Sequence, residues 1–186
     1  MSDAVASVES LIERLPDYAK DIRLNLSTVL TSEGAPDLTE VQIAGIALSV
    51  AYATRNPDVI GAIENFAQGK LDAAGLQAAK AAATIMAMNN VYYRFVHTVH
   101  NDEISKMPAQ LRMTVIGKPG VAKVDFELMS LAVSMVNNCA MCMQSHVHEV
   151  AKQGISKTGI QSVARIAAVI SAAAQAMVIL TTSTLE

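Results

Sequence analysis

Residues 121–186 read VAKVDFELMSLAVSMVNNCAMCMQSHVHEVAKQGISKTGIQSVARIAAVISAAAQAMVILTTSTLE, and this stretch decides the fold class. It contains no proline, and its apolar residues recur at the three-to-four-residue spacing of an α-helical face. Gly154 and Ser156 have the residue types of a helix C-cap and the next helix N-cap. The stretch therefore predicts three helices, over residues 124–136, 139–153 and 156–180.

The residues before this stretch carry the start and stop signals of further helices. The predicted starts are Pro16–Asp17 before a helix over 18–30, an Asp37/Glu40 capping box opening 38–54, Asn56–Pro57, and Asp72 before a helix towards His100. Polar residues 101–106 are expected to end the last of these, Pro108 to open a short helical piece, and residues 117–120 to form a turn. No segment alternates with period two, so the sequence predicts an all-α fold.

Composition and charge narrow the class of protein. The 186 residues are 52% hydrophobic and 17% charged, which predicts a single domain over residues 1–186. A net charge of -3 with no basic block argues against a nucleic acid or an anionic membrane as partner. The start, Met1–Ala4, lacks the features of a secretory signal. The apolar run Ile166–Leu180 is shorter than the ~20 residues that span a bilayer, and predicts a buried helix or a subunit interface. We therefore expect a cytoplasmic protein with no membrane partner.

Both cysteines and a histidine fall within eight residues, Cys139 to His146. On a helix, Cys139, Cys142 and His146 lie at i, i+3 and i+7 and share one face. Two thiols at this spacing can close an intramolecular disulfide, and a nearby imidazole favours the reactive thiolate. Because His146 lies one turn beyond Cys142, we interpret Cys142 as the nucleophile that attacks a peroxide and Cys139 as the resolving cysteine.

Two other interpretations of this motif stay open at the level of sequence. The cysteines are also compatible with small buried hydrophobic residues in an Ala- and Met-rich helix. A metal site is less favoured, since structural zinc takes four ligands and the chain has no second cysteine pair. In a cytosolic protein a lone Cys-x-x-Cys is typical of a cycling redox pair.

Two carboxylates are candidates for orienting His146. Glu149 is one turn beyond the histidine, where a solvated charge or an i, i+3 partner is the usual case. Glu127 lies among apolar residues of the preceding helix, where an unpartnered carboxylate would be costly, so it is the stronger candidate. The other histidines, His97, His100 and His148, have no comparable neighbours in the sequence and are expected to be structural.

A weak internal similarity suggests a duplication. Residues 88–100 align without gaps with residues 136–148, matching an Asn-Asn pair and a final histidine. In the first copy Val91, Arg94 and Thr98 occupy the positions of the two cysteines and His146. If the duplication is real, only the second copy kept the redox residues.

The chain resembles the alkyl hydroperoxidase D (AhpD) family of the carboxymuconolactone decarboxylase-like superfamily. The resemblance runs from LPDYAKDI (15–22) through ATRNP (53–57), MNNVYYR (88–94) and FEL (126–128). It includes the active-site pattern of a glutamate, Cys-x-x-Cys and a histidine, matched by Glu127, Cys139, Cys142 and His146. One departure is Met141, where many relatives carry a histidine before the second cysteine, and methionine cannot relay a proton.

The resemblance implies a helical subunit assembled as a homotrimer, with no tightly bound cofactor and no metal. It implies a lipoyl-dependent peroxidase that reduces alkyl hydroperoxides, with Glu127 and His146 in a proton relay to Cys142. Dihydrolipoamide is the implied reductant, supplied by a lipoylated acyltransferase and dihydrolipoamide dehydrogenase, and an AhpC-type peroxiredoxin is a possible client.

Two alternatives follow from the same residues. A disulfide adaptor would pass electrons from dihydrolipoyl groups to an AhpC-type peroxiredoxin through the same dithiol. A non-redox helical scaffold or ligand-binding oligomer would resemble the decarboxylases of the wider superfamily, and its activity would survive loss of both cysteines.

Overall fold

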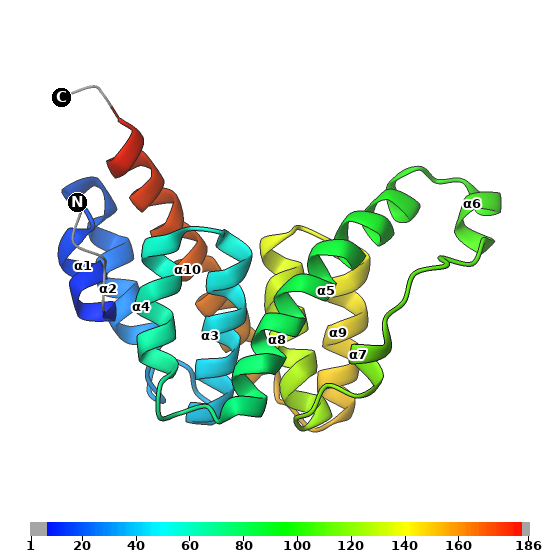
Figure 1. The fold of residues 1–186 in the computed structure, drawn as a ribbon, viewed down its shortest axis with the longest axis horizontal. Coiled ribbons are helices and arrows are strands. Elements are labelled where there is room, and N and C mark those ends of the chain that lie inside the picture. Colours follow the sequence, from blue (N-terminus) through cyan, green and yellow to red (C-terminus); the bar gives the residue numbers. More distant parts are fainter. Residues whose placement is uncertain (1–6, 184–186) are drawn as a thin grey trace.

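All regular elements of the described chain are helices (Figure 1). The computed structural model describes residues 7–183; Met1–Ala4, from which no secretory signal is expected, lie outside them. The elements are α1 (Val8–Arg14), a 3-10 turn η1 (Asp17–Ala19), α2 (Lys20–Val29), α3 (Glu40–Thr54), α4 (Pro57–Ala67), α5 (Ala73–Thr98), α6 (Asp102–Lys106), α7 (Thr114–Gly117), α8 (Lys123–Val136), α9 (Ala140–Lys152) and α10 (Lys157–Thr182). The predicted all-α fold is confirmed.

Most predicted helix boundaries are confirmed by their caps. Asn56, Asp72 and Ser156 each accept a hydrogen bond from the backbone N–H three residues later, at 2.7 to 3.1 Å. Gly154 follows the C-cap of α9 with φ +93°, a left-handed conformation that glycine adopts without steric cost.

Two local predictions are wrong. The capping box of α3 is formed by Thr39 and Gln42 rather than by Asp37 and Glu40, because Asp37 is in a left-handed conformation with φ +64° before the helix begins. Pro108 opens no helix, and the next helical turn is α7. Helix α5 ends at Thr98, before the polar residues 101–106, as predicted. These residues also form α6, whose N-cap Asn101 accepts hydrogen bonds from two backbone N–H groups. The first helix, α1, was not predicted at all.

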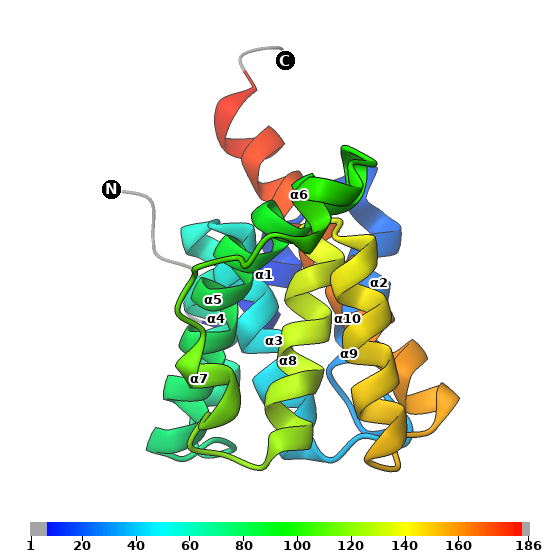
Figure 2. The ribbon, with the colours of Figure 1, turned by 90° about the vertical axis from the view of Figure 1, so that its right-hand side faces the viewer.

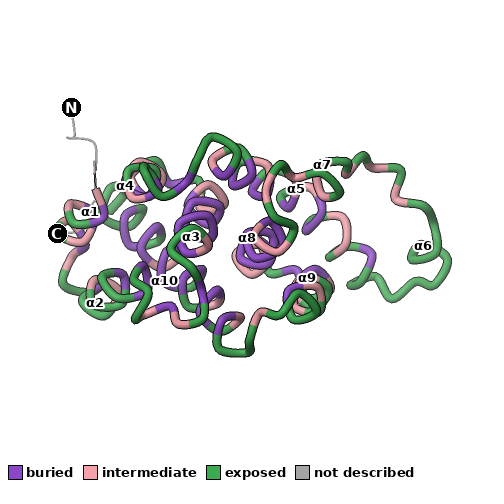
Figure 3. Tube along the Cα trace, turned by 90° about the horizontal axis from the view of Figure 1, so that it is seen from below, coloured by how far each residue is buried: buried purple, intermediate pink, exposed green. Residues whose placement is uncertain are grey.

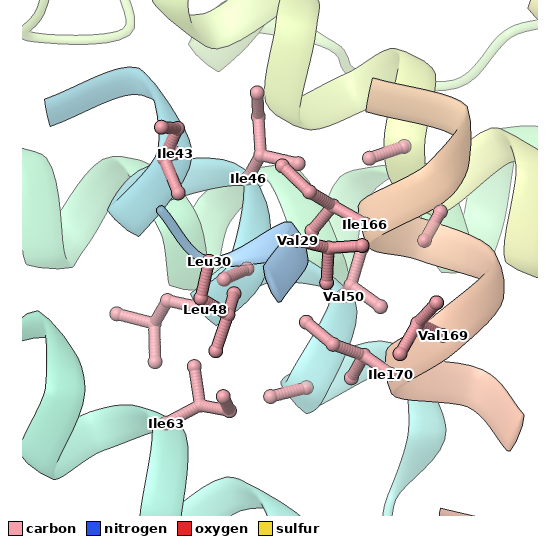
Figure 4. Packing of buried hydrophobic residues seen from close by; sticks show 14 of the residues in the cluster. Val29, Leu30, Ile43, Ile46, Leu48, Val50, Ile63, Ile166, Val169 and Ile170 are labelled. Atoms are coloured by element: carbon pink, nitrogen blue, oxygen red, sulfur yellow. The ribbon is translucent and has the colours of Figure 1, made fainter. Parts of the chain in front are cut away.

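The core lies around α3, which packs against α4, α5, α8 and α10. Residues Ile43 to Ala51 of α3 are all buried, as expected of a helix that is apolar on every side. Figure 4 shows Ile46 and Val50 of α3 beside Ile166 and Ile170 of α10. Viewed from below, α3 and α8 are the most continuously buried helices (Figure 3).

Helix α10 is long and apolar enough to cross a membrane by length and composition alone. It nevertheless packs against α2, α3, α4 and α8, and half of its most apolar window is buried in the protein. These contacts are those of a core helix, and most residues from Ile166 to Met177 are buried, as one of the two predicted alternatives requires. Val178, Ile179 and Leu180 are 41–43% exposed.

The dithiol lies at the start of α9, on the side of the core where α5, α8 and α9 pack against one another. Helix α8 packs against α3, and α9 packs against α8 and α5 (Figure 2). Beyond them, the end of α5 and the segment that contains α6 extend away from the body of the molecule (Figure 1).

Candidate active site

Glu127 is a carboxylate inside the protein core. It lies in α8 within nine consecutive buried residues, Phe126 to Ser134, and its side chain is 6% exposed. Burying a carboxylate without partners costs several kcal/mol. The partner is His146 of α9, whose Nδ1 lies 2.7 Å from Oε2 of Glu127. The contact fixes the imidazole ring and leaves Nε2 as the ring nitrogen available for proton exchange.

The turn between α8 and α9 sets the position of the first cysteine. Asn138 is left-handed, with φ +53°, a conformation that asparagine tolerates better than most residues. The backbone N–H groups of Asn138 and Cys139 donate to the carbonyls of Met135 and Ser134, each at 3.1 Å. This is a Schellman motif, which ends α8 and delivers Cys139 as the N-cap of α9. The helix predicted to begin at Cys139 therefore begins one residue later.

Cys139 and Cys142 form a disulfide, so the structure is that of the oxidised protein. Both sulfurs are engaged in this bond, and neither is free to ligate a metal in this state. Cys139 is completely buried and Cys142 is 7% exposed. Cys142 and His146 are four residues apart on α9 and therefore neighbours on the same face.

A hydrogen-bonded network ties the redox turn to α5. Asn90 of α5 donates from Nδ2 to Oγ of Ser134 at 2.9 Å and accepts at Oδ1 from Nδ2 of Asn137 at 3.0 Å. Arg94, one turn along α5, donates to the carbonyl of Asn137 at 2.8 Å. The network holds the last turn of α8 and the Asn137–Asn138 turn against α5, directly before Cys139.

A pocket of about 280 Å³ opens beside the dithiol between α5, α7, α8 and α9. Cys142, His146 and Glu127 line it, whereas Cys139 does not. Most of the remaining wall is apolar or aromatic and comes from Met86, Tyr93, Met113, Ile116 and Met141. A molecule that enters the pocket reaches Cys142 before Cys139, and its apolar part meets thioether and aliphatic side chains.

Glu149 lies at the same pocket, but its partner is Lys123 and not His146, the i, i+3 neighbour that the sequence allowed. Nζ of Lys123 lies 3.1 Å from Oε2 of Glu149, which joins the start of α8 to α9. The hydrogen bond from Lys123 holds the pKa of Glu149 below its usual range. Glu149 is thus an ionised partner of Lys123, and Glu127 is the carboxylate that contacts His146.

The other histidines lie apart from this pocket. His148 is exposed on α9, and the rings of His97 and His100 lie 6.2 Å apart near the end of α5. None of the three lines the pocket around Cys142. The two segments of the suggested duplication differ locally, because Asn89–Asn90 lies inside α5 whereas Asn137–Asn138 forms a turn. The duplication stays a prediction.

Comparison with known proteins places the chain in a family. The model of the carboxymuconolactone decarboxylase family matches residues 102–182. A Coxiella burnetii protein named alkyl hydroperoxide reductase AhpD is 53% identical over 167 residues, covering 90% of this chain and 94% of that protein. Proteins of the same name from Rhodospirillum centenum and Brucella canis are 58% and 49% identical, covering 90% and 92% of this chain and 89% and 96% of those proteins. The chain belongs to the AhpD family.

Membership of the AhpD family confirms the resemblance drawn from the sequence. The structure brings together Glu127, Cys139, Cys142 and His146, and it places Met141 in the pocket wall. The role of Asn90 was missed. A signal was available, because two consecutive asparagines in an Ala-rich helix are poor helix formers with polar groups to satisfy.

We expect Asn90→Ala to destabilise the protein. The substitution leaves the buried hydroxyl of Ser134 and the amide of Asn137 without their partner, which costs about 1–3 kcal/mol in the free energy of unfolding. Urea denaturation measures the loss, and Asn65→Ala on the exposed surface of α4 is the matched control, expected to change stability by less than ~0.5 kcal/mol. Equal stability of both variants would contradict a structural role for Asn90.

Proposed function

We propose that this protein is a dithiol peroxidase that reduces alkyl hydroperoxides and takes its electrons from dihydrolipoamide. The observation that carries the proposal is the contact between Glu127 and His146, 2.7 Å long, beside Cys142 on the wall of a largely apolar pocket. The names of relatives about 50% identical support the peroxide-reducing activity. The family resemblance alone supports the lipoyl dependence.

The first step consumes the peroxide. In the reduced enzyme, His146 accepts the proton of the Cys142 thiol, and the carboxylate of Glu127 stabilises the resulting imidazolium. The Cys142 thiolate attacks the terminal oxygen of ROOH, a sulfur–oxygen bond forms and the oxygen–oxygen bond breaks. The departing RO⁻ takes the proton held by His146 and leaves as ROH. Cys142 becomes a sulfenic acid, oxidised by two electrons.

The second step closes the disulfide. The Cys139 sulfur attacks the Cys142 sulfenic acid, and the hydroxyl leaves with the Cys139 proton as water. The product is the Cys139–Cys142 disulfide of the oxidised structure. Dihydrolipoamide then reduces this disulfide by thiol–disulfide exchange and becomes the cyclic disulfide lipoamide. The cycle restores both thiols and needs no metal or tightly bound cofactor.

The proposed partners follow from the reductant. A lipoylated acyltransferase and its dihydrolipoamide dehydrogenase would supply the electrons, in the cytoplasm. An AhpC-type peroxiredoxin is the proposed client in the alternative function, a disulfide adaptor. The peroxidase is favoured because Cys142 is reached through a pocket with apolar walls, which suits a small organic peroxide.

We also propose that the chain assembles as a homotrimer. Val91 and Phe95 of α5 and its C-cap residue Val99 form an exposed stripe, and they are 61%, 51% and 38% exposed. Their i, i+4, i+8 spacing places them on one helix face, and Met107 in the protruding segment adds a further exposed apolar side chain. Such a stripe favours self-association, and the number three rests on the family resemblance.

Substitution of each cysteine separates the two chemical steps. Cys142→Ser is expected to abolish turnover of an alkyl hydroperoxide with dihydrolipoamide. Cys139→Ser is expected to lose turnover but to form one equivalent of sulfenic acid on Cys142, trapped with dimedone and identified by mass spectrometry. Persistent turnover in Cys142→Ser would contradict the proposed peroxidase. No turnover in the unaltered protein, with the disulfide still reduced by dihydrolipoamide, would favour the adaptor.

Sedimentation velocity tests the proposed assembly. The unaltered protein is expected at three times the 19.7 kDa mass of the chain. Phe95→Glu places a charge in the apolar stripe and is expected to shift the protein to smaller species, whereas Gln161→Glu on the exposed surface of α10 is not. A monomeric unaltered protein at micromolar concentration would contradict the trimer.

A further inference from the structure

In the described part of the chain, one buried polar atom of the pocket wall has no partner, the Oδ1 of the Asn89 carboxamide. Asn89 lies on the face of α5 that also presents Met86 and Tyr93 to the pocket, and it is 5% exposed. Among residues 7–183, no group hydrogen-bonds to its buried Oδ1. The adjacent Asn90, in contrast, is hydrogen-bonded to Ser134 and Asn137. Hydrogen bonds within the protein thus explain why an asparagine is buried at position 90. No contact among the described residues explains the buried asparagine at position 89.

A buried amide without a partner destabilises a folded protein, so its presence in a pocket points to a ligand that satisfies it. The charged groups of the same pocket already have partners, since Glu127 contacts His146 and Glu149 contacts Lys123. An amide oxygen is an acceptor, so the group that satisfies Oδ1 of Asn89 is a hydrogen-bond donor. The hydroperoxy group has a strong O–H donor, whereas the thiols of dihydrolipoamide are weak donors.

We propose that Asn89 binds the hydroperoxy group of the substrate, an assignment that rests on the proposed peroxidase function. Oδ1 of Asn89 accepts a hydrogen bond from the terminal O–H, and the NH₂ of the same carboxamide donates to the inner oxygen. The alkyl group then lies against the apolar side chains of Met86, Met113 and Ile116.

This binding mode presents the terminal oxygen to the sulfur of Cys142 without any proton transfer from Asn89. When the oxygen–oxygen bond breaks, the terminal oxygen stays on Cys142 as the sulfenic acid. The electron pair goes to the inner oxygen, where the NH₂ of Asn89 stabilises the developing charge until the proton from His146 arrives. Asn89 is thus expected to act on the oxidation of the dithiol and not on its reduction.

The test compares the two half-reactions in Asn89→Leu, a substitution of similar volume without hydrogen-bonding groups. The reduced protein is mixed with an alkyl hydroperoxide, and loss of thiols is followed in a single turnover. We expect the second-order rate constant to fall by about tenfold, while reduction of the disulfide by dihydrolipoamide keeps its rate. The thermal midpoint of unfolding is expected to stay equal or to rise, because an unpartnered buried amide is removed. The matched control, Asn65→Leu on exposed α4, is expected to change neither rate.

Each result has a definite meaning. An unchanged rate of oxidation in Asn89→Leu, with the unaltered protein reactive, overturns the role of Asn89 and leaves the peroxidase intact. Slower reduction by dihydrolipoamide with unchanged oxidation also overturns it and assigns the amide to the reductant. An unreactive unaltered protein overturns both proposals. If Asn89→Leu does not fold, Asn89→Ala, with the best helix-forming residue, is measured with the same expectations.

Discussion

The contact between the buried carboxylate of Glu127 and the imidazole of His146 is the constraint on which the site depends. Glu127 lies near the start of the continuously buried part of α8, and its side chain is only 6% exposed, so little solvent compensates its charge. Only a correctly placed α9 brings a partner to it. The relative position of α8 and α9 is therefore fixed by the chemistry of one residue in each helix.

Both ends of this helix pair are held in place. At the redox turn, the left-handed Asn138 ends α8, and Asn90 and Arg94 of α5 fasten the turn through Ser134 and Asn137. At the opposite end, Lys123 of α8 bridges to Glu149 of α9. The dithiol consequently lies at the N-terminal end of α9, with Cys139 completely buried and Cys142 on the pocket wall. In the proposed peroxidase, this difference in exposure makes Cys142 the sulfur that the peroxide reaches first.

Sequence reasoning succeeds where the signal is local. The helices after residue 121, the caps at Asn56, Asp72 and Ser156, and the spacing of Cys139, Cys142 and His146 depend on neighbours in the chain. Glu127 was found because a carboxylate among apolar residues needs a partner. Asn90 was missed because its partners, Ser134 and Asn137, lie more than 40 positions away in the sequence. Asn89 was missed because only the folded structure shows that its buried Oδ1 has no partner among the described residues. The capping box of α3 was displaced because the left-handed conformation of Asp37 cannot be read from its residue type.

The most direct test of the account is the rate at which an alkyl hydroperoxide oxidises the reduced dithiol in Glu127→Gln. Glutamine keeps the size of the side chain and its hydrogen-bonding capacity but removes the charge that stabilises a protonated His146. The account predicts a second-order rate constant lower by about 10²-fold or more, with complete closure of the disulfide by excess of the thiol oxidant diamide and no change in the exposed control Glu40→Gln. A rate within twofold of the unaltered protein would contradict the claim that this buried pair activates Cys142.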